Sequence, residues 1–191
     1  MNKERARKKI EAFDFASLFA DELLWNRLRA GATVDADGRA IELKGIAEKS
    51  GVQVFHCPPL DDGRLPPYAL RQKIERALTR QAREHLVIYT DAGNTAQVWQ
   101  WVAREPGKPA AYRELVWHKS QASELLLEKL GLIAFRLEDD DTLLTVIEVA
   151  GKLRDAFDRE KLTKRFYDNF KLARDAFAGF IKGLPDAASQ S

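Results

Sequence analysis

The chain has 191 residues and a usual globular share of hydrophobic residues, 45%, so one domain with a sizeable core is expected. No apolar run approaches the roughly 20 residues that span a bilayer, and no signal-type stretch follows the basic segment 1–9, so neither a membrane partner nor export is expected. The formal net charge of +2 does not by itself indicate nucleic-acid binding, and the single cysteine, Cys57, fits a reducing cytoplasm.

The N-terminal third predicts one helix and two short strands. Apolar residues at helical spacing predict a helix over Phe15–Leu28, and the polar segment Gly31–Gly38 is turn-rich. Short strands are expected at Ala40–Leu43 and at Val52–Cys57, followed by a loop over Pro58–Pro67.

The middle of the chain predicts a helix between strands. The helix is expected over Leu70–Ala82, with an apolar face and an opposite face that carries Arg71, Lys73, Glu75 and Arg76. His85–Tyr89 is apolar enough to be a buried strand, and Asp91–Asn94 turns the chain. Val98–Val102 predicts a second strand, and Tyr112–Trp117 is a possible third.

The second half predicts helices. Leu125–Leu130 has a compact apolar pattern, and Leu143–Phe157 is expected to be helical, although β-branched residues leave a strand open at its start. Apolar residues three or four apart, many of them phenylalanine, predict a long helix from about Arg159 to Ile181. We expect this aromatic stripe to be only partly covered by residues 1–160.

These elements predict an α/β (α+β) fold with a small mixed central sheet flanked by helices. The order helix, strand, strand, helix, strand is that of restriction endonucleases, and a long C-terminal helix follows. The expected boundaries are 1–150 for the α/β module, 151–183 for a helical connector and 184–191 for a flexible tail.

Familiar catalytic signatures are missing from the sequence. There is no phosphate-cradling loop, nucleophile elbow or zinc-binding His-Glu-x-x-His helix. The histidines His56, His85 and His118 are scattered, and His56 and Cys57, as strand neighbours, should point to opposite faces. A structural role is expected for each, and no metal site is predicted.

One pattern leaves a nuclease open as the alternative function. A magnesium-dependent endonuclease of the restriction type needs a helix glutamate, a strand aspartate and a Glu-x-Lys on the next strand. The chain offers Glu22, then Asp35 or Asp37, and then Glu42 with Lys44. Only four residues separate Asp37 from Glu42, which leaves little room for a hairpin with both ends at one metal.

Several segments resemble the N-terminal region of large single-chain type II restriction–modification enzymes and related class I adenine-specific DNA methyltransferases. Together they cover most of residues 40–183, in a specific order and spacing. They are Ile46–Phe55, Arg83–Asp91, Gln97–Val102, Arg104–Pro109 and, strongest, Leu162–Phe170, which resembles the connector toward a methyltransferase domain.

The resemblance implies a module that precedes a methyltransferase core in a restriction or phage-defence system. That downstream domain would bind S-adenosylmethionine and the target adenine, and this segment would hold no cofactor unless the nuclease alternative requires magnesium. Where a nuclease places Glu-x-Lys, the strand Val52–Cys57 reads Gln-Val-Phe. This departure favours a degenerate nuclease-like or purely structural domain.

The leading hypothesis is therefore a non-catalytic accessory domain that helps to hold DNA or packs against the methyltransferase domain. Residues 152–182 carry nine basic and five acidic groups, and their predicted helix could meet DNA phosphate. The expected contacts are Lys164, Arg165, Lys171 and Arg174. A scaffold without DNA contact is the third possibility.

Overall fold

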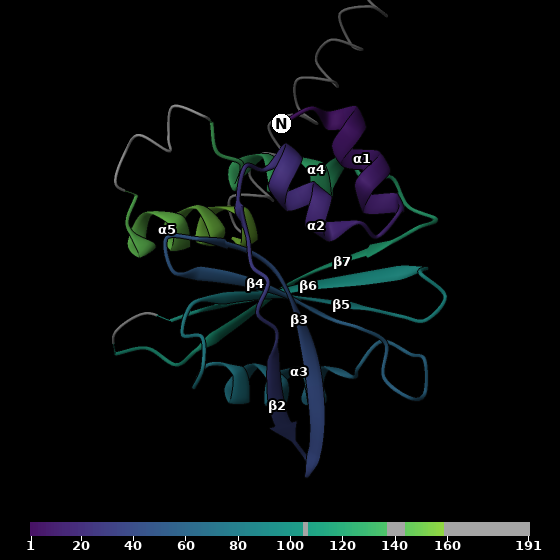
Figure 1. Cartoon of the computed structure of the whole chain (residues 1–191), viewed down its shortest axis with the longest axis vertical. Helices are drawn as coiled ribbons and strands as arrows, with labels where there is room; N and C mark the ends of the chain where they lie inside the picture. Colours follow the sequence, from purple (N-terminus) through teal and green to yellow (C-terminus); the bar gives the residue numbers. More distant parts are fainter. Residues whose placement is uncertain (105–106, 137–143, 159–191) are drawn as a thin grey trace, which may run out of the picture. The chain divides into compact units, whose positions relative to one another are not determined.

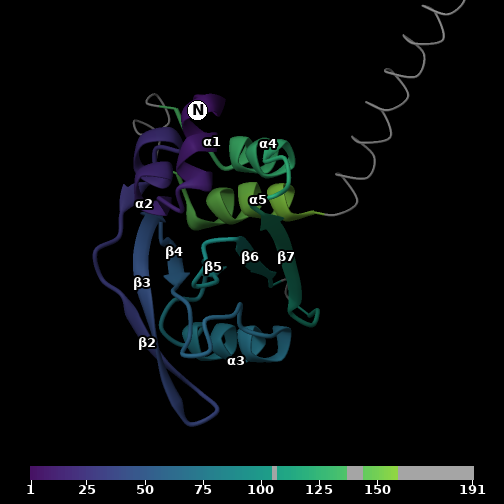
Figure 2. The same ribbon diagram turned by 90° about the vertical axis from the view of Figure 1, so that its right-hand side faces the viewer.

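A seven-stranded mixed sheet lies at the centre of the computed structural model, with helices on both faces (Figures 1 and 2). The structure describes residues 1–104, 107–136 and 144–158, and all of these except Asp158 belong to the compact unit Met1–Phe157. The strands are β1 Asn26–Arg27, β2 Ala32–Ala36, β3 Arg39–Lys49, β4 Val52–Cys57, β5 His85–Thr90, β6 Ala96–Ala103 and β7 Ala111–His118. The helices are α1 Lys3–Glu11, α2 Phe15–Ser17, the π-helical turn η1 Leu18–Glu22, α3 Tyr68–Leu78, α4 Glu124–Leu132 and α5 Val146–Phe157.

The sheet has one parallel pair of strands. The order is β1-β3-β4-β5-β6-β7, with β2 paired to the outer half of β3. β4 and β5 run parallel because α3 crosses over between them, and the other neighbouring strands are antiparallel. The mixed α/β fold predicted from the sequence is confirmed, including the strands at 52–57, 86–89 and 98–102 and the helix between them.

Two cores form because strand side chains alternate between the faces of the sheet. Along β5, Leu86 and Ile88 face the core under α1, α2, α4 and α5, whereas Val87 and Tyr89 face the core under α3. β5 is buried throughout, as a central parallel strand should be. The helix-rich side also holds all the tryptophans, Trp25, Trp99, Trp101 and Trp117.

Two tight turns connect β2, β3 and β4, and they explain why β2 was missed and β3 was predicted too short. Asp37-Gly38 joins β2 to β3 and Ser50-Gly51 joins β3 to β4, and all four residues have positive φ. A two-residue turn of this kind matches the right-handed twist of its strands. The expected strand 40–43 is therefore an 11-residue strand, and the segment 31–38, which was expected to be a turn, contains β2.

The predicted helix over Phe15–Leu28 is wrong in its second half. Asp14 caps α2, the chain continues as the π-helical turn η1, and Leu24 at φ 58° reverses it before β1. The indole of Trp25 then donates to the carbonyl oxygen of Ile133 at 2.8 Å. This contact lies 108 residues away along the chain, so local periodicity could not show where the helix ends.

The remaining predictions have mixed outcomes. β7, α4 and α5 form where strands and helices were expected, and the possible strand at the start of α5 is helical. α1 was not predicted, because only Ala6 and Ile10 of its nine residues are buried. The expected helix at 159–181, its aromatic stripe and the tail lie outside the described residues. No helix in the described part of the chain is long and apolar enough to cross a membrane.

Candidate nucleic-acid interface

α3 presents a face that carries only positive charge. Among the described residues it is the helix on its side of the sheet, opposite α1, α2, α4 and α5 (Figure 1). Ile74 and Leu78 are buried against the sheet, and helical turns continue past the end of α3 to residue 82. Lys73 and Arg76 are exposed on α3, Arg80 is exposed in the turn that follows it, and Arg83 is exposed in the segment before β5; we call these four cations the α3 cationic row.

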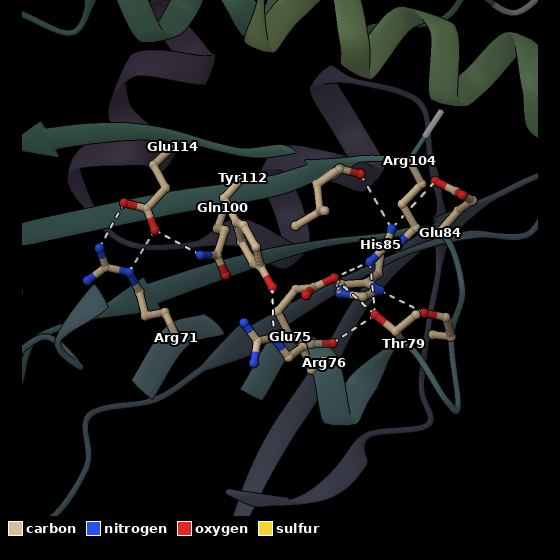
Figure 3. Close-up of polar contacts among 12 residues, drawn as sticks. Arg71, Glu75, Arg76, Thr79, Glu84, His85, Gln100, Arg104, Tyr112 and Glu114 are labelled. Atoms are coloured by element: carbon tan, nitrogen blue, oxygen red, sulfur yellow. Dashed lines mark hydrogen bonds and ion pairs between the residues drawn. The ribbon is translucent and has the colours of Figure 1, made fainter. Parts of the chain in front are cut away.

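The acid of α3, Glu75, is turned inward and is 3% exposed. Its carboxylate forms a close ion pair with Arg104 at the end of β6 and accepts a hydrogen bond of 3.0 Å from the hydroxyl of Thr79 (Figure 3). The Arg104 guanidinium also donates to the Thr79 hydroxyl oxygen at 2.9 Å. Arg104 neutralises the buried carboxylate, which therefore does not cancel the charge of the cationic row.

His85 lies behind this pair as a neutral ring. Its Nδ1 is 2.7 Å from the carbonyl oxygen of Ala82, so Nδ1 carries the hydrogen and donates it. Burial lowers the pKa of His85 to about 4, an effect that the nearby Arg104 strengthens and Glu75 opposes. Nε2 is buried, 3.8 Å from a Glu75 oxygen, and has no hydrogen-bond partner among the described residues. His85 is therefore a buried, neutral side chain that packs beside Glu75 and forms no ion pair with it.

A second buried ion pair fixes the other end of α3. Arg71 donates two hydrogen bonds, of 3.0 and 2.8 Å, to the carboxylate oxygens of Glu114 on β7. Gln100 also donates to Glu114 (Figure 3). The side-chain oxygen of Gln100 in turn accepts from the hydroxyl of Tyr89. Ion pairs from both Arg71 and Glu75 thus attach α3 to the sheet, which fixes the position of the helix backbone that carries Lys73 and Arg76.

The cations of the row have few protein partners. Lys73 pairs with Asp37 at 2.5 Å in the β2–β3 turn, but both side chains are about half exposed, and such pairs are weak. The Nε of Arg76 donates to the hydroxyl of Tyr112 at 3.3 Å. The side chains of Arg80 and Arg83 make no hydrogen bond or ion pair with any described residue, although the charge of Arg83 acts on the nearby Glu84. The row is therefore available to an anionic partner.

Beside the row is a pocket of about 360 Å³ between α3 and the start of β7. Its lining is formed by Glu75, Arg76, Thr79, Arg104, Ala110 and Tyr112. Burial is the main cause that raises the pKa of Tyr112, so this phenol stays protonated at neutral pH. The pocket wall thus has two guanidinium groups, two hydroxyl groups and the carboxylate of Glu75, which is paired with Arg104.

The structure does not bring the residues of the nuclease alternative to one point. Glu22, on η1, is 3% exposed and its carboxylate accepts from the backbone nitrogen of Asn2 at 3.1 Å. It also pairs with Arg5 and Lys9 at 3.5 and 3.6 Å. Glu22 thus anchors α1 on the helix-rich side of the sheet, where these cations already neutralise its charge.

The other residues of that alternative lie on the β2–β3 hairpin. Asp37 is in the turn, bonded to Lys73 of α3, and Asp35 accepts from the turn nitrogen of Gly38. Glu42 and Lys44 share the exposed face of β3. Across the described residues, no three His, Cys, Asp or Glu side chains are placed to hold a metal ion.

The strand before α3 also lacks the Glu-x-Lys chemistry. On β4, Gln53-Val54-Phe55 occupies that position, and Val54 and Phe55 are buried in opposite cores. Burial raises the pKa of the Cys57 thiol to about 12, so this free cysteine is a poor nucleophile and metal ligand. His56, which contacts Phe15, faces the other core, as strand alternation predicts.

The sequence analysis recognised the cations of α3 but placed Glu75 and Arg71 on the wrong face. Both are largely buried, as the spacing 71, 74, 75 and 78 could have indicated, because residues at i, i+3, i+4 and i+7 share one helix face. The basic residues that it proposed for DNA, Lys164, Arg165, Lys171 and Arg174, lie outside the described residues.

Comparisons with family models, with curated proteins and with solved structures give no match to this chain.

Proposed function

We propose that this chain is the N-terminal accessory module of a DNA restriction–modification methyltransferase, located in the cytoplasm and without a catalytic centre of its own. Its role is to hold DNA by the phosphate backbone. The downstream domain would supply S-adenosylmethionine binding and adenine recognition. The proposal is supported by the resemblance of Arg83–Asp91 and Leu162–Phe170 to such enzymes and by the surface of α3.

The observation that carries the proposal is the inward position of Glu75. Because Arg104 neutralises this carboxylate inside the protein, the row Lys73, Arg76, Arg80 and Arg83 faces solvent with no acid of α3 among them. Cations of this kind gain affinity for DNA by releasing the counterions of its phosphates. Phosphate contacts position a protein on the duplex without reading its sequence, which suits an accessory module.

The arrangement does not favour the nuclease alternative. A magnesium site needs several oxygen ligands at one point, and Glu22, Asp37 and Glu42 are separated between the helix-rich side and the β2–β3 hairpin. The module therefore contributes binding and leaves chemistry to the rest of the protein.

The test is DNA binding by the full chain, measured by fluorescence anisotropy with a labelled duplex at low salt. The row variant replaces Lys73, Arg76, Arg80 and Arg83 by Gln. The control variant replaces four exposed cations elsewhere, Lys3, Lys8, Arg64 and Lys119, by Gln, so that both lose the same charge.

We expect the row variant to lose at least tenfold in affinity and the control variant to lose less than threefold. Equal losses would mean that only net charge matters and would contradict a specific α3 surface. No binding by the unmodified chain would contradict the proposed function itself.

A further inference from the structure

The pocket beside the cationic row is lined by two guanidinium groups whose hydrogen-bonding capacity is only partly used by the described residues. Arg76 uses its Nε for Tyr112, at 3.3 Å, and its two terminal nitrogens make no hydrogen bond with any described residue. Arg104 uses one terminal nitrogen for Glu75 and Thr79. Toward the described residues, its other terminal nitrogen has two long contacts, 3.4 Å to the carbonyl oxygen of Val102 and 4.0 Å to Glu84.

Tyr112 fixes the direction of one of these guanidiniums. Its hydroxyl oxygen accepts from the Arg76 Nε at 3.3 Å (Figure 3), and both residues line the pocket. A guanidinium held by its Nε can still offer both terminal nitrogens to one anion, as a fork that matches two phosphate oxygens. Lysine has no such planar fork.

The acids at the pocket are already engaged. Glu75 is paired with Arg104 and Thr79. Glu84 lies 4.0 Å from Arg104, and burial raises the pKa of its carboxyl. Among the lining residues, the two arginines Arg76 and Arg104 exceed the one carboxylate, Glu75, so the pocket lining keeps a net positive charge.

We propose that this pocket binds one phosphate group between the guanidiniums of Arg76 and Arg104, with Tyr112 as the residue that positions Arg76. Its volume of about 360 Å³ is large enough for a phosphate group. The inference deepens the proposed function, and it rests on that function for the statement that the phosphate belongs to DNA. The cationic row attracts the phosphate backbone of DNA by its charge, whereas the pocket binds a single phosphate through directed hydrogen bonds.

The same chemistry fits a phosphodiester of the backbone and a phosphomonoester at a DNA end. Three labelled probes separate these sources: a duplex with 5′-phosphates, the same duplex with 5′-hydroxyls, and a dumbbell duplex without ends. The proteins are the full chain, the double variant Arg76→Lys with Tyr112→Phe, and the control Arg64→Lys at an exposed loop position. None of these substitutions changes the net charge.

We expect the double variant to bind at least fivefold more weakly, whereas the control keeps the affinity of the unmodified chain. A loss on all three probes identifies a backbone diester, and a loss only on the 5′-phosphate duplex identifies a terminal monoester. If the unmodified chain binds DNA and the double variant binds equally well, the pocket inference is overturned while the proposed function stands. If the unmodified chain does not bind, the proposed function fails.

A second measurement uses the unmodified chain and does not depend on how a variant folds. Arginine-selective modification with phenylglyoxal, followed by peptide mass spectrometry, reports the reactivity of Arg76 and of the exposed reference Arg64. Inorganic phosphate should slow the modification of Arg76 at least threefold relative to chloride at equal ionic strength, and leave Arg64 unchanged. Equal protection of both residues would show nonspecific screening and would overturn the inference.

Discussion

Glu75 determines the charge of the α3 surface because it is the acid that the helix keeps out of solvent. Its side chain is 4% exposed and its partner Arg104 is 17% exposed, so the pair is well screened from water. Replacing such a pair by apolar residues can be neutral, but removing one partner leaves an uncompensated buried charge.

We therefore expect Glu75→Gln to lower the free energy of unfolding by about 3 kcal/mol. Urea denaturation followed by tryptophan fluorescence measures the change, since all four tryptophans lie in one core. The control Glu42→Gln removes an exposed carboxylate of β3 and should cost less than about 0.5 kcal/mol. A loss below about 1 kcal/mol in Glu75→Gln would contradict the importance of the pair.

His85 should make stability depend on pH. Burial lowers its pKa from 6.5 to about 4. A depressed folded-state pKa means that the unfolded chain takes up the proton first, so stability is complete above pH 6.5 and is lost as pH falls toward 4. The loss from His85 is on the order of 3 kcal/mol.

The variant His85→Asn tests this dependence, because the amide of asparagine can keep the donor to Ala82 without titrating. Urea denaturation at several pH values should show a shallower decline between pH 6.5 and 4 than in the unmodified chain. The exposed His118→Asn variant should keep the original decline, and identical declines in all three proteins would refute the assignment to His85.

At the scale of the elements, β3 changes its partner near Gly45. Its outer half pairs with β2 and its inner half with β1, and the register with β4 shifts between Gly45 and Ala47. A Cβ atom built at Gly45 would lie 2.1 Å from the backbone oxygen of Ala30. The segment between β1 and β2 can cross β3 closely only because this residue has no side chain.

We expect Gly45→Ala to lower the free energy of unfolding by at least about 2 kcal/mol, since the clash is with backbone and requires the crossing segment to move. Gly151→Ala is the matched control, because Gly151 lies in α5 with nothing within 4 Å of its missing Cβ. The control should stabilise the protein by up to about 1 kcal/mol. Thermal and urea unfolding check both, and a stable Gly45→Ala variant would contradict the close crossing.

Elements that are determined by contacts between residues close in sequence were predicted accurately, whereas elements that depend on contacts between distant residues were not. β4, β5, β6 and α3 were predicted well, because each shows its own period or a continuous apolar run and is ended by turn residues. β2 was missed although Asp37-Gly38 is a typical hairpin turn. The end of η1 depends on Trp25 bonding to Ile133, which no local pattern contains.

The candidate site was only partly predictable. The basic residues of α3 are visible in the sequence, and the helical spacing of Glu75 could have indicated its burial. The partner Arg104 could not be identified, because it comes from the end of β6, 29 residues further along. Burial of Glu75 and the pocket both depend on that tertiary contact.

At the scale of the whole molecule, the proposed function is DNA binding without metal chemistry. Supercoiled plasmid incubated with the full chain and Mg²⁺ should be neither nicked nor linearised, because the carboxylates of Glu22, Asp37 and Glu42 do not converge. Gel electrophoresis checks this outcome. Cleavage that disappears in Glu42→Ala or Lys44→Ala would instead establish the nuclease alternative.

The most direct test of the central claim is the salt dependence of DNA binding, because counterion release counts phosphate contacts. If the four cations of the α3 row each neutralise a phosphate, the logarithm of the binding constant should fall with the logarithm of salt concentration at a slope of roughly −3 to −4. In the variant with Lys73, Arg76, Arg80 and Arg83 replaced by Gln, the slope should approach zero, while the variant at Lys3, Lys8, Arg64 and Lys119 keeps the original slope. An unchanged slope in the row variant would contradict the assignment of α3 as the DNA-binding surface.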